Sequence, residues 1–193
     1  MADAPPAAPL LLASTSPQRR AILEQLGIAY TVVESGYVEH ELPGLTPAQA
    51  AVEHARGKVA EAGDADLTLG VDTVVDVDGS LLGKPADEAE AAAMLRLLGG
   101  RAHLVHSGLC LRVAGVVHTR LASTEVTFRP LRDGDIAWYV ATGEWRGRAG
   151  GYAVQGKGAA LVRRIAGDYS NVVGLPVAAL LDLLGETEQA VHC

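Results

Sequence analysis

Residues Leu10–Leu26 read LLLASTSPQRRAILEQL, and this stretch predicts a strand that turns directly into a helix. The apolar run Leu10–Ala13 is typical of a short buried strand. Ser16 suits the capping position of a helix, and Pro17 suits its first turn, where the missing N–H is not needed. Gly27 supplies a stop signal after the helix. The chain therefore begins with a strand–turn–helix unit.

Two arginines lie in the first turn of this expected helix, where cations are unfavourable. The helix macrodipole repels Arg19 and Arg20 by roughly 0.3–1 kcal/mol each if they are exposed. The same turn offers unpaired backbone N–H groups and the hydroxyls of Ser14, Thr15 and Ser16. A bound anion would satisfy these donors and reverse the repulsion. The turn therefore predicts a phosphate site, with an ordinary capped helix and solvated arginines as the alternative.

The rest of the sequence alternates strand and helix signals around a long hairpin. A hairpin is expected between 101–113 and 116–129, with Ala114-Gly115 as its turn. Further strands are expected over 29–34, 67–77, 161–165 and 169–173, and helices over 46–61, 87–98, 133–141 and from Pro176 onward. This order predicts an α/β or α+β protein with a mixed, elongated sheet. We expect a disordered lead-in over 1–8, one domain of two lobes over 9–185, and a tail over 186–193.

Composition predicts a globular, acidic protein. The 193 residues are 49% hydrophobic and carry a net charge of −7, which argues against nucleic-acid binding because that needs a basic surface. No apolar run approaches the roughly 20 residues that span a bilayer, and the first residues do not resemble a secretory signal. Cys110 and Cys193 have no metal-binding spacing, and Cys110 is expected to be buried. We therefore expect a cytoplasmic protein without membrane contact.

Asp72 lies in an expected strand that is otherwise suited to a protein core. A carboxylate there must pair with a cation, bind a metal or face a cleft, and a Lys or Arg partner is the simplest alternative. Lys84 could return to the same end of the sheet, and Glu39 could add a second carboxylate for a divalent cation, although both also suit a solvated surface. The sequence shows no arrangement for a Ser or Cys nucleophile. The pattern favours metal-assisted attack of water on a phosphoryl group.

The segment Gly147–Gly158 is rich in glycine but matches neither a Walker loop nor G-x-G-x-x-G. Gln155 within it offers both a donor and an acceptor, which is what reading the edge of a base requires. A simple turn is the alternative for this segment.

Three segments together resemble the Maf family of nucleoside triphosphate pyrophosphatases, also called septum formation proteins. They are LASTSPQRRAIL near the start, GVDTVVDVDGSLLGKP in the middle and GGYAVQGKGAALVRRIAGDYSNVVGLP toward the end. Their order and spacing agree with the family from about Leu10 to Leu184. The resemblance implies an ITPase-like α/β fold, with an elongated mixed sheet and two lobes around a deep cleft. It also implies a homodimer and Mg²⁺- or Mn²⁺-dependent hydrolysis of a nucleoside triphosphate to a monophosphate and pyrophosphate.

The resemblance also implies roles for individual residues. Asp72 matches the family's proposed general base, and Asp72 and Glu39 match metal positions. The positions that match substrate binding are Ser14, Ser16, Arg19, Lys58 and Lys84. The positions that match substrate selection are Gln18, Thr73 and Gln155.

The selecting positions resemble the branch that acts on dTTP and UTP, because Thr73 and Gln155 agree with it. Gln18 departs from the Arg often found in that branch, and Gly147 stands where an Asp is expected. The alternatives are a 7-methyl-GTP pyrophosphatase of the same family and a nucleotide-binding regulator of cell division with little turnover.

Overall fold

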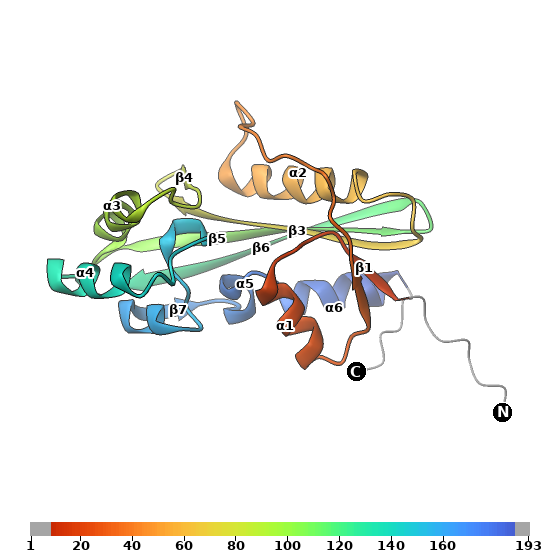
Figure 1. Ribbon diagram of the computed structural model, residues 1–193. Helices are drawn as coiled ribbons and strands as arrows, with labels where there is room; N and C mark the ends of the chain where they lie inside the picture. Colours follow the sequence, from red (N-terminus) through yellow and green to blue (C-terminus); the bar gives the residue numbers. More distant parts are fainter. Residues whose placement is uncertain (1–8, 188–193) are drawn as a thin grey trace.

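The computed structural model describes residues 9–187 as one elongated sheet with helices on both faces (Figure 1). The expected lead-in and residues 188–193 of the expected tail lie outside the described residues. The elements are β1 Leu10–Leu12, α1 Pro17–Gln25, β2 Tyr30–Val32, α2 Pro47–Ala60, β3 Leu67–Val77, β4 Ser80–Leu82, α3 Glu88–Leu98, β5 Ala102–Val113, β6 Val116–Phe128, α4 Asp133–Ala141, β7 Val162–Ala166, α5 Tyr169–Val173 and α6 Val177–Glu186. Within residues 9–187, no helix has the length and apolar character that crossing a membrane requires.

The sheet has seven strands in the order β2-β1-β3-β5-β6-β7, and β4 pairs with β3. Strand β1 runs parallel to β2 and β3, whereas the pairings of β3 with β4 and β5, of β5 with β6 and of β6 with β7 are antiparallel. The long hairpin of β5 and β6 turns at Ala114-Gly115, and both turn residues have positive φ. The mixed, elongated sheet expected from the sequence is therefore confirmed.

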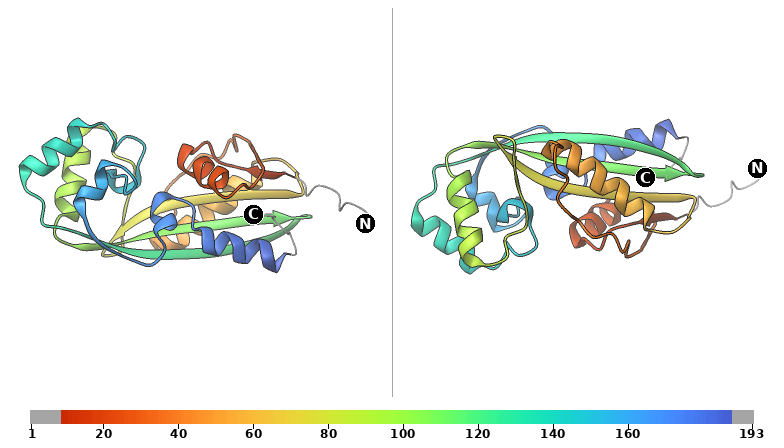
Figure 2. Two further views of the ribbon diagram at one scale, coloured as in Figure 1. Left: turned by 90° about the horizontal axis from the view of Figure 1, so that it is seen from below. Right: turned by 90° about the horizontal axis from the view of Figure 1, so that it is seen from above.

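The hydrophobic core has two large clusters at opposite ends of this sheet and a small third cluster of Ala55, Val59 and Cys110 between α2 and β5. The first cluster joins β1, α1 and α6 to the first part of β3 and includes Leu12, Leu69 and Leu180. The second cluster joins α3 and α4 to the last part of β3 and includes Val77 and Tyr139. We call these ends the first and second lobes, and Figure 2 shows them from two sides. Strands β3 and β5 contribute residues to both clusters.

Helix α2 packs unusually close to the sheet because glycine lies beneath it. A Cβ on Gly70 would be 2.4 Å from the Ala55 carbonyl oxygen, and one on Gly108 would be 2.3 Å from that of Ala51. Only glycine permits this approach of helix backbone to strand backbone. The close packing holds Lys58 of α2 over β3.

Residues 169–173 form helix α5, so the strand expected there is wrong. The Asp168 carboxylate accepts a hydrogen bond from the Ser170 N–H at 2.7 Å and caps the helix. The buried Asn171 donates to the Val105 carbonyl at 2.9 Å, which anchors the helix to β5. These polar contacts outweigh the strand preference of Val172 and Val173.

Candidate active site

The ten candidate site residues from the sequence line one open pocket of about 1430 Å³. Its walls come from the turn after β1, the loop before α2, strand β3, the segment after β4 and the glycine-rich segment of the second lobe. The residues are Ser14, Ser16, Gln18, Arg19, Glu39, Lys58, Asp72, Thr73, Lys84 and Gln155. The structure therefore brings all of them to one cavity, and their individual roles stay predictions.

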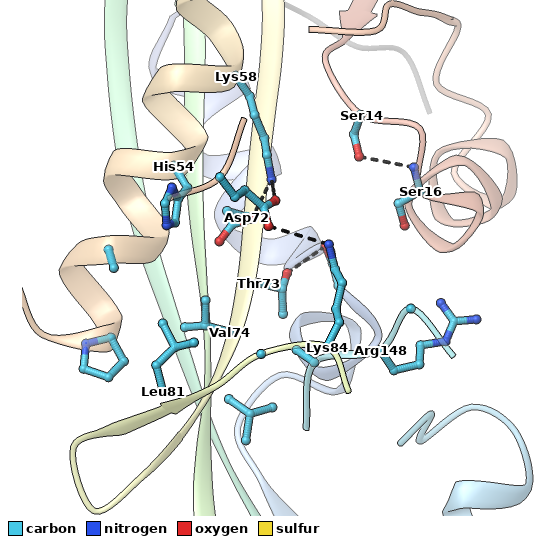
Figure 3. Close-up of a pocket in the computed structure, with 18 of the residues that line it drawn as sticks. Ser14, Ser16, His54, Lys58, Asp72, Thr73, Val74, Leu81, Lys84 and Arg148 are labelled. Carbon is cyan, nitrogen blue, oxygen red and sulfur yellow. Dashed lines mark hydrogen bonds and ion pairs between the residues drawn. The ribbon is translucent and has the colours of Figure 1, made fainter. Parts of the chain in front are cut away.

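Lys58 lies between the two carboxylates at the centre of this pocket (Figure 3). Its Nζ is 2.5 Å from Asp72 Oδ1 and 2.7 Å from Glu39 Oε1, and Lys84 Nζ is 3.7 Å from Glu39 Oε2. Asp72 is only 6% exposed. The simplest alternative for Asp72, pairing with a lysine, is therefore found in the structure. Asp72 also lines the pocket. Three elements meet here, because Lys58 comes from α2, Asp72 from β3 and Glu39 from the loop after β2.

This arrangement changes the acidity of Glu39. Burial opposes ionisation, but the hydrogen bond and charge of Lys58, together with the charge of Lys84, lower the pKa of Glu39 to about 2. The carboxylate is therefore ionised at neutral pH and available to a cation.

Arg19 and Arg20 have different environments. Arg19 is buried and donates from Nε to the Gly174 carbonyl at 2.9 Å, from Nη1 to Ser14 Oγ at 2.8 Å and from Nη2 to Thr73 Oγ1 at 3.2 Å. Burial lowers the pKa of Arg19, and the negative charges of Asp72 and Glu39 oppose that shift. Arg20 is exposed and does not line the pocket. Only one of the two arginines therefore belongs to the site.

Ser16 lies at the expected capping position of α1 but does not cap the helix with its side chain. Ser16 occupies the capping position, but its hydroxyl donates to Gln18 Oε1 at 3.1 Å instead of accepting from the helix backbone. The Ser16 N–H donates to Ser14 Oγ at 3.3 Å. The hydroxyl of Thr73 lies 2.9 Å from Ser107 Oγ as well as close to Arg19. Thr73 therefore contacts the predicted phosphate-binding arginine directly.

Tyr37 and His54 also line the pocket, although we did not predict them from the sequence. The Tyr37 hydroxyl lies 3.0 Å from His54 Nδ1, and the Tyr37 ring packs where a side chain on Gly57 would be. This contact holds the loop that carries Glu39 against α2. The available signal was spacing, because His54 precedes Lys58 by four residues and so shares its helix face.

Glu39 and Asp72 are the carboxylates of the pocket that could hold a divalent cation. Within residues 9–187 no three His, Cys, Asp or Glu side chains are grouped as metal ligands. Glu39 and Asp72, however, converge on a single ammonium group, which shows that this position favours positive charge. Mg²⁺ is commonly held by one or two carboxylates while substrate phosphates and water complete its shell. The residues therefore fit a cation that binds together with a nucleotide.

Another polar cluster arises outside the pocket from cross-strand pairing. His106 Nδ1 lies 2.7 Å from Ser123 Oγ, and His106 Nε2 lies 3.4 Å from Asp76 Oδ2. The sequence did not reveal this Ser/His/Asp group, because three separate strands contribute to it. None of these three residues lines the pocket that holds the candidate site residues. The geometry does not support nucleophilic catalysis there.

Comparison with known proteins places the chain in a family. The model of the Maf-like protein family matches residues 9–187. A protein from Thermus thermophilus named dTTP/UTP pyrophosphatase is 48% identical over 176 residues, covering 91% of this chain and 93% of that protein. Proteins of the same name from Pelotomaculum thermopropionicum and Deinococcus radiodurans are 46% and 43% identical, each over 91% of this chain, and the matches cover 94% and 91% of those proteins.

A solved structure of a HAM1 protein from Coxiella burnetii has the same fold. It superposes with a TM-score of 0.51 at 18% identity, covering 94% of this chain and 98% of that one. The ITPase-like α/β fold is therefore confirmed. Fold, pocket and relatives agree, and the chain belongs to the Maf-like protein family.

Proposed function

We propose that this protein hydrolyses dTTP, UTP or related modified pyrimidine nucleotides to the monophosphate and pyrophosphate. The observation that carries the proposal is the meeting of Asp72, Glu39, Lys58 and Lys84 in one pocket with Arg19 at the start of α1. Relatives named dTTP/UTP pyrophosphatase support the substrate class.

Asp72 acts as the general base. It accepts a proton from water that attacks the α-phosphorus, while the bond from that phosphorus to the bridging oxygen breaks and pyrophosphate leaves. Lys58 contacts Asp72 through Oδ1 and donates no hydrogen bond to Oδ2 within residues 9–187, which leaves that oxygen to receive the proton. Lys58 also offsets the cost of burying the Asp72 carboxylate by pairing with it.

The cations of the pocket bind and stabilise the phosphates. Within residues 9–187, three of the five N–H donors of Arg19 have protein acceptors, which leaves two for a phosphate oxygen. Ser14 and Ser16 add hydroxyls at the same turn, and Lys84 is 59% exposed and free to turn toward the leaving pyrophosphate. Developing negative charge is thereby met by groups that are already in place.

Glu39 and Asp72 would hold Mg²⁺ or Mn²⁺ when the nucleotide is bound. Such a cation supplies charge neutralisation at the phosphoryl oxygens. Gln155 and Thr73 are the proposed residues that select the nucleobase of the substrate. Gln18, in the first turn of α1, is the third proposed selecting residue.

Pyrophosphate release from a panel of nucleotides tests the proposal. The panel contains dTTP, UTP, CTP, dATP and 7-methyl-GTP, each with Mg²⁺, Mn²⁺ or EDTA. We expect release from dTTP and UTP that EDTA abolishes. Release from 7-methyl-GTP alone would identify the other branch, and tight binding without release would identify a regulator.

Asp72→Asn tests the base directly. We expect turnover to fall by about 10²–10⁴-fold because the amide cannot accept the proton, while the circular dichroism spectrum stays that of a folded protein. Asp76→Asn is the matched control, since Asp76 lies four residues along the same strand and outside the pocket. Near-normal rates in Asp72→Asn would overturn the assignment.

We also propose a cytoplasmic homodimer. The resemblance to the family supports the dimer, and so does a sheet face on which Leu81, Leu104 and Leu121 stay exposed. A molar mass of about twice 20.0 kDa by light scattering tests it. Cell fractionation tests the compartment.

A further inference from the structure

Glu144 is a carboxylate that binds backbone instead of a cation. It follows α4, and its side chain makes no salt bridge within residues 9–187. Oε1 accepts from the Lys157 N–H at 3.0 Å, and Oε2 accepts from the Gly158 N–H at 2.9 Å and from the Tyr139 hydroxyl at 3.1 Å. Glu144 does not line the pocket. Three hydrogen bonds to one carboxylate indicate that it organises the segment that donates them.

That segment is the turn 153–158, which carries Gln155. The Ala153 N–H donates to the Tyr139 hydroxyl at 2.9 Å, and the Gly156 N–H closes the turn on the Ala153 carbonyl at 3.2 Å. The turn is therefore held on one side by Tyr139 and on the other by Glu144, and Tyr139 itself donates to Glu144. Gln155 lies between the two attachments, exposed and lining the pocket. Its side chain makes no hydrogen bond to any residue of 9–187.

The turn has no room to move relative to the carboxylate. A Cβ on Gly156 would lie 2.2 Å from Glu144 Oε1, so the backbone next to Gln155 packs directly on that oxygen. Tyr139 is fully buried, and burial raises its pKa, so it stays a donor. Burial opposes ionisation of Glu144, but the two backbone N–H groups and Tyr139 lower its pKa. Both oxygens accept, which an amide in its place could not do.

We propose that Glu144 is a positioning residue that sets the base selectivity of the pocket by fixing Gln155. The inference rests on the proposed function, in which Gln155 contacts the base. An amide that reads a base edge discriminates only where its donor and acceptor are correctly placed, and displacements near 1 Å are enough to lose the effect. Glu144 and Tyr139 supply that placement from outside the pocket.

The test compares kcat/KM for UTP and CTP, whose bases differ in the exchange of a carbonyl acceptor for an amino donor and of a ring N–H donor for a ring-nitrogen acceptor. The ratio of the two values is measured in the wild type, Glu144→Gln, Gln155→Ala and the double variant. We expect Glu144→Gln to lower the ratio by about 10- to 100-fold, mainly through a higher KM for UTP. In the Gln155→Ala background the same substitution should change the ratio no further, because the two residues act in series.

Asp135→Asn is the matched control. Asp135 is also a carboxylate of the α4 region, and it binds Arg129 at 2.9 Å and the Arg132 N–H at 2.9 Å, away from the turn. This variant should unfold at a lower temperature without changing the ratio. If Glu144→Gln does not fold, Tyr139→Phe replaces it in the test, because this substitution removes the hydroxyl that contacts Glu144 and the Ala153 N–H but keeps the ring. We expect it to lower the UTP/CTP ratio of kcat/KM by the same factor.

The outcomes separate the inference from the proposed function. The inference is overturned if Glu144→Gln leaves the UTP/CTP ratio unchanged while Gln155→Ala lowers it. It is also overturned if the double variant has a lower ratio than Gln155→Ala alone. An unchanged ratio in Gln155→Ala overturns both the inference and the selector role of Gln155, while hydrolysis of UTP still stands. If the wild type releases no pyrophosphate, the proposed function fails, and the ratio of Kd values for UTP and CTP from calorimetry decides the inference in the same way.

Discussion

At the scale of single residues, Lys58 decides the chemistry that the site can support. A buried carboxylate without a partner would be protonated or strongly destabilising. Lys58 contacts both Asp72 and Glu39, so one ammonium group pairs with both carboxylates in one small region. The arrangement keeps the proposed base, Asp72, and the proposed cation ligand, Glu39, together before substrate binds.

The lowered pKa of Glu39 predicts how stability depends on pH. The pKa falls from an ordinary value of 4.5 to about 2 in the folded protein, so the folded state gains stability above 4.5 and loses it as the pH falls toward 2. Because 43% of the Glu39 side chain is exposed, solvent reduces the size of this effect. We expect Glu39→Gln to flatten the pH dependence of the urea midpoint between pH 5 and 2.

Glu41→Gln serves as the control for this series, because Glu41 is an exposed carboxylate on the same loop. It should follow the wild-type curve. Superimposable curves for Glu39→Gln and the wild type would show that Lys58 does not stabilise the Glu39 carboxylate.

At the scale of elements, the docking of α2 on the sheet places Lys58. Gly70 and Gly108 remove the side chains that would separate the helix from β3 and β5. Ala51 and Ala55 present equally small surfaces from the helix side, and both are fully buried. The close contact therefore depends on four small residues in two segments that are far apart in the sequence.

Gly108→Ala tests this contact. The added Cβ would lie 2.3 Å from the Ala51 oxygen and 2.5 Å from the Val52 Cα, and backbone atoms cannot rotate away. We expect the free energy of unfolding in urea to fall by about 1–3 kcal/mol or more, and turnover to fall because Lys58 moves with α2. Gly134→Ala in α4 is the control, since no atom lies within 4 Å of its Cβ position. Equal stability of the two variants would exclude close packing as the reason for glycine at this position.

At the scale of the whole molecule, the two large core clusters share strands β3 and β5. Strand β3 contributes Leu69 and Val71 to the first lobe and Val75 and Val77 to the second. Strands β5 and β6 pair along almost their whole length, so neither lobe can lose its sheet alone. The pocket between the lobes is thereby built on continuous strands.

This continuity predicts a single unfolding transition. Trp138 lies in α4 and the buried Trp145 lies in the second cluster, so tryptophan fluorescence reports on the second lobe. Far-UV ellipticity reports on both lobes. We expect the two urea midpoints to coincide in the absence of nucleotide. A fluorescence midpoint clearly apart from the ellipticity midpoint would show that the lobes unfold separately.

Local sequence determined most of the elements, and the resemblance to a family supplied candidate site residues that line one pocket. Some features act over only a few residues, such as apolar runs, the capping residue Thr46 and the turn at Ala114-Gly115. They can therefore be predicted without knowledge of the fold. The helix at Tyr169–Val173 was not predicted, because the cap at Asp168 and the contact of Asn171 with β5 outweigh the local preference of this segment for a strand.

Only the tertiary structure decided which of these residues act together. The burial of Arg19 but not Arg20, the position of Lys58 between carboxylates 19 and 14 residues away, and the attachment of Gln155 to Glu144 all depend on how helices and turns dock. Such contacts join groups from separate elements. They cannot be predicted from a local sequence pattern, because the packing of those elements brings the groups within hydrogen-bond distance.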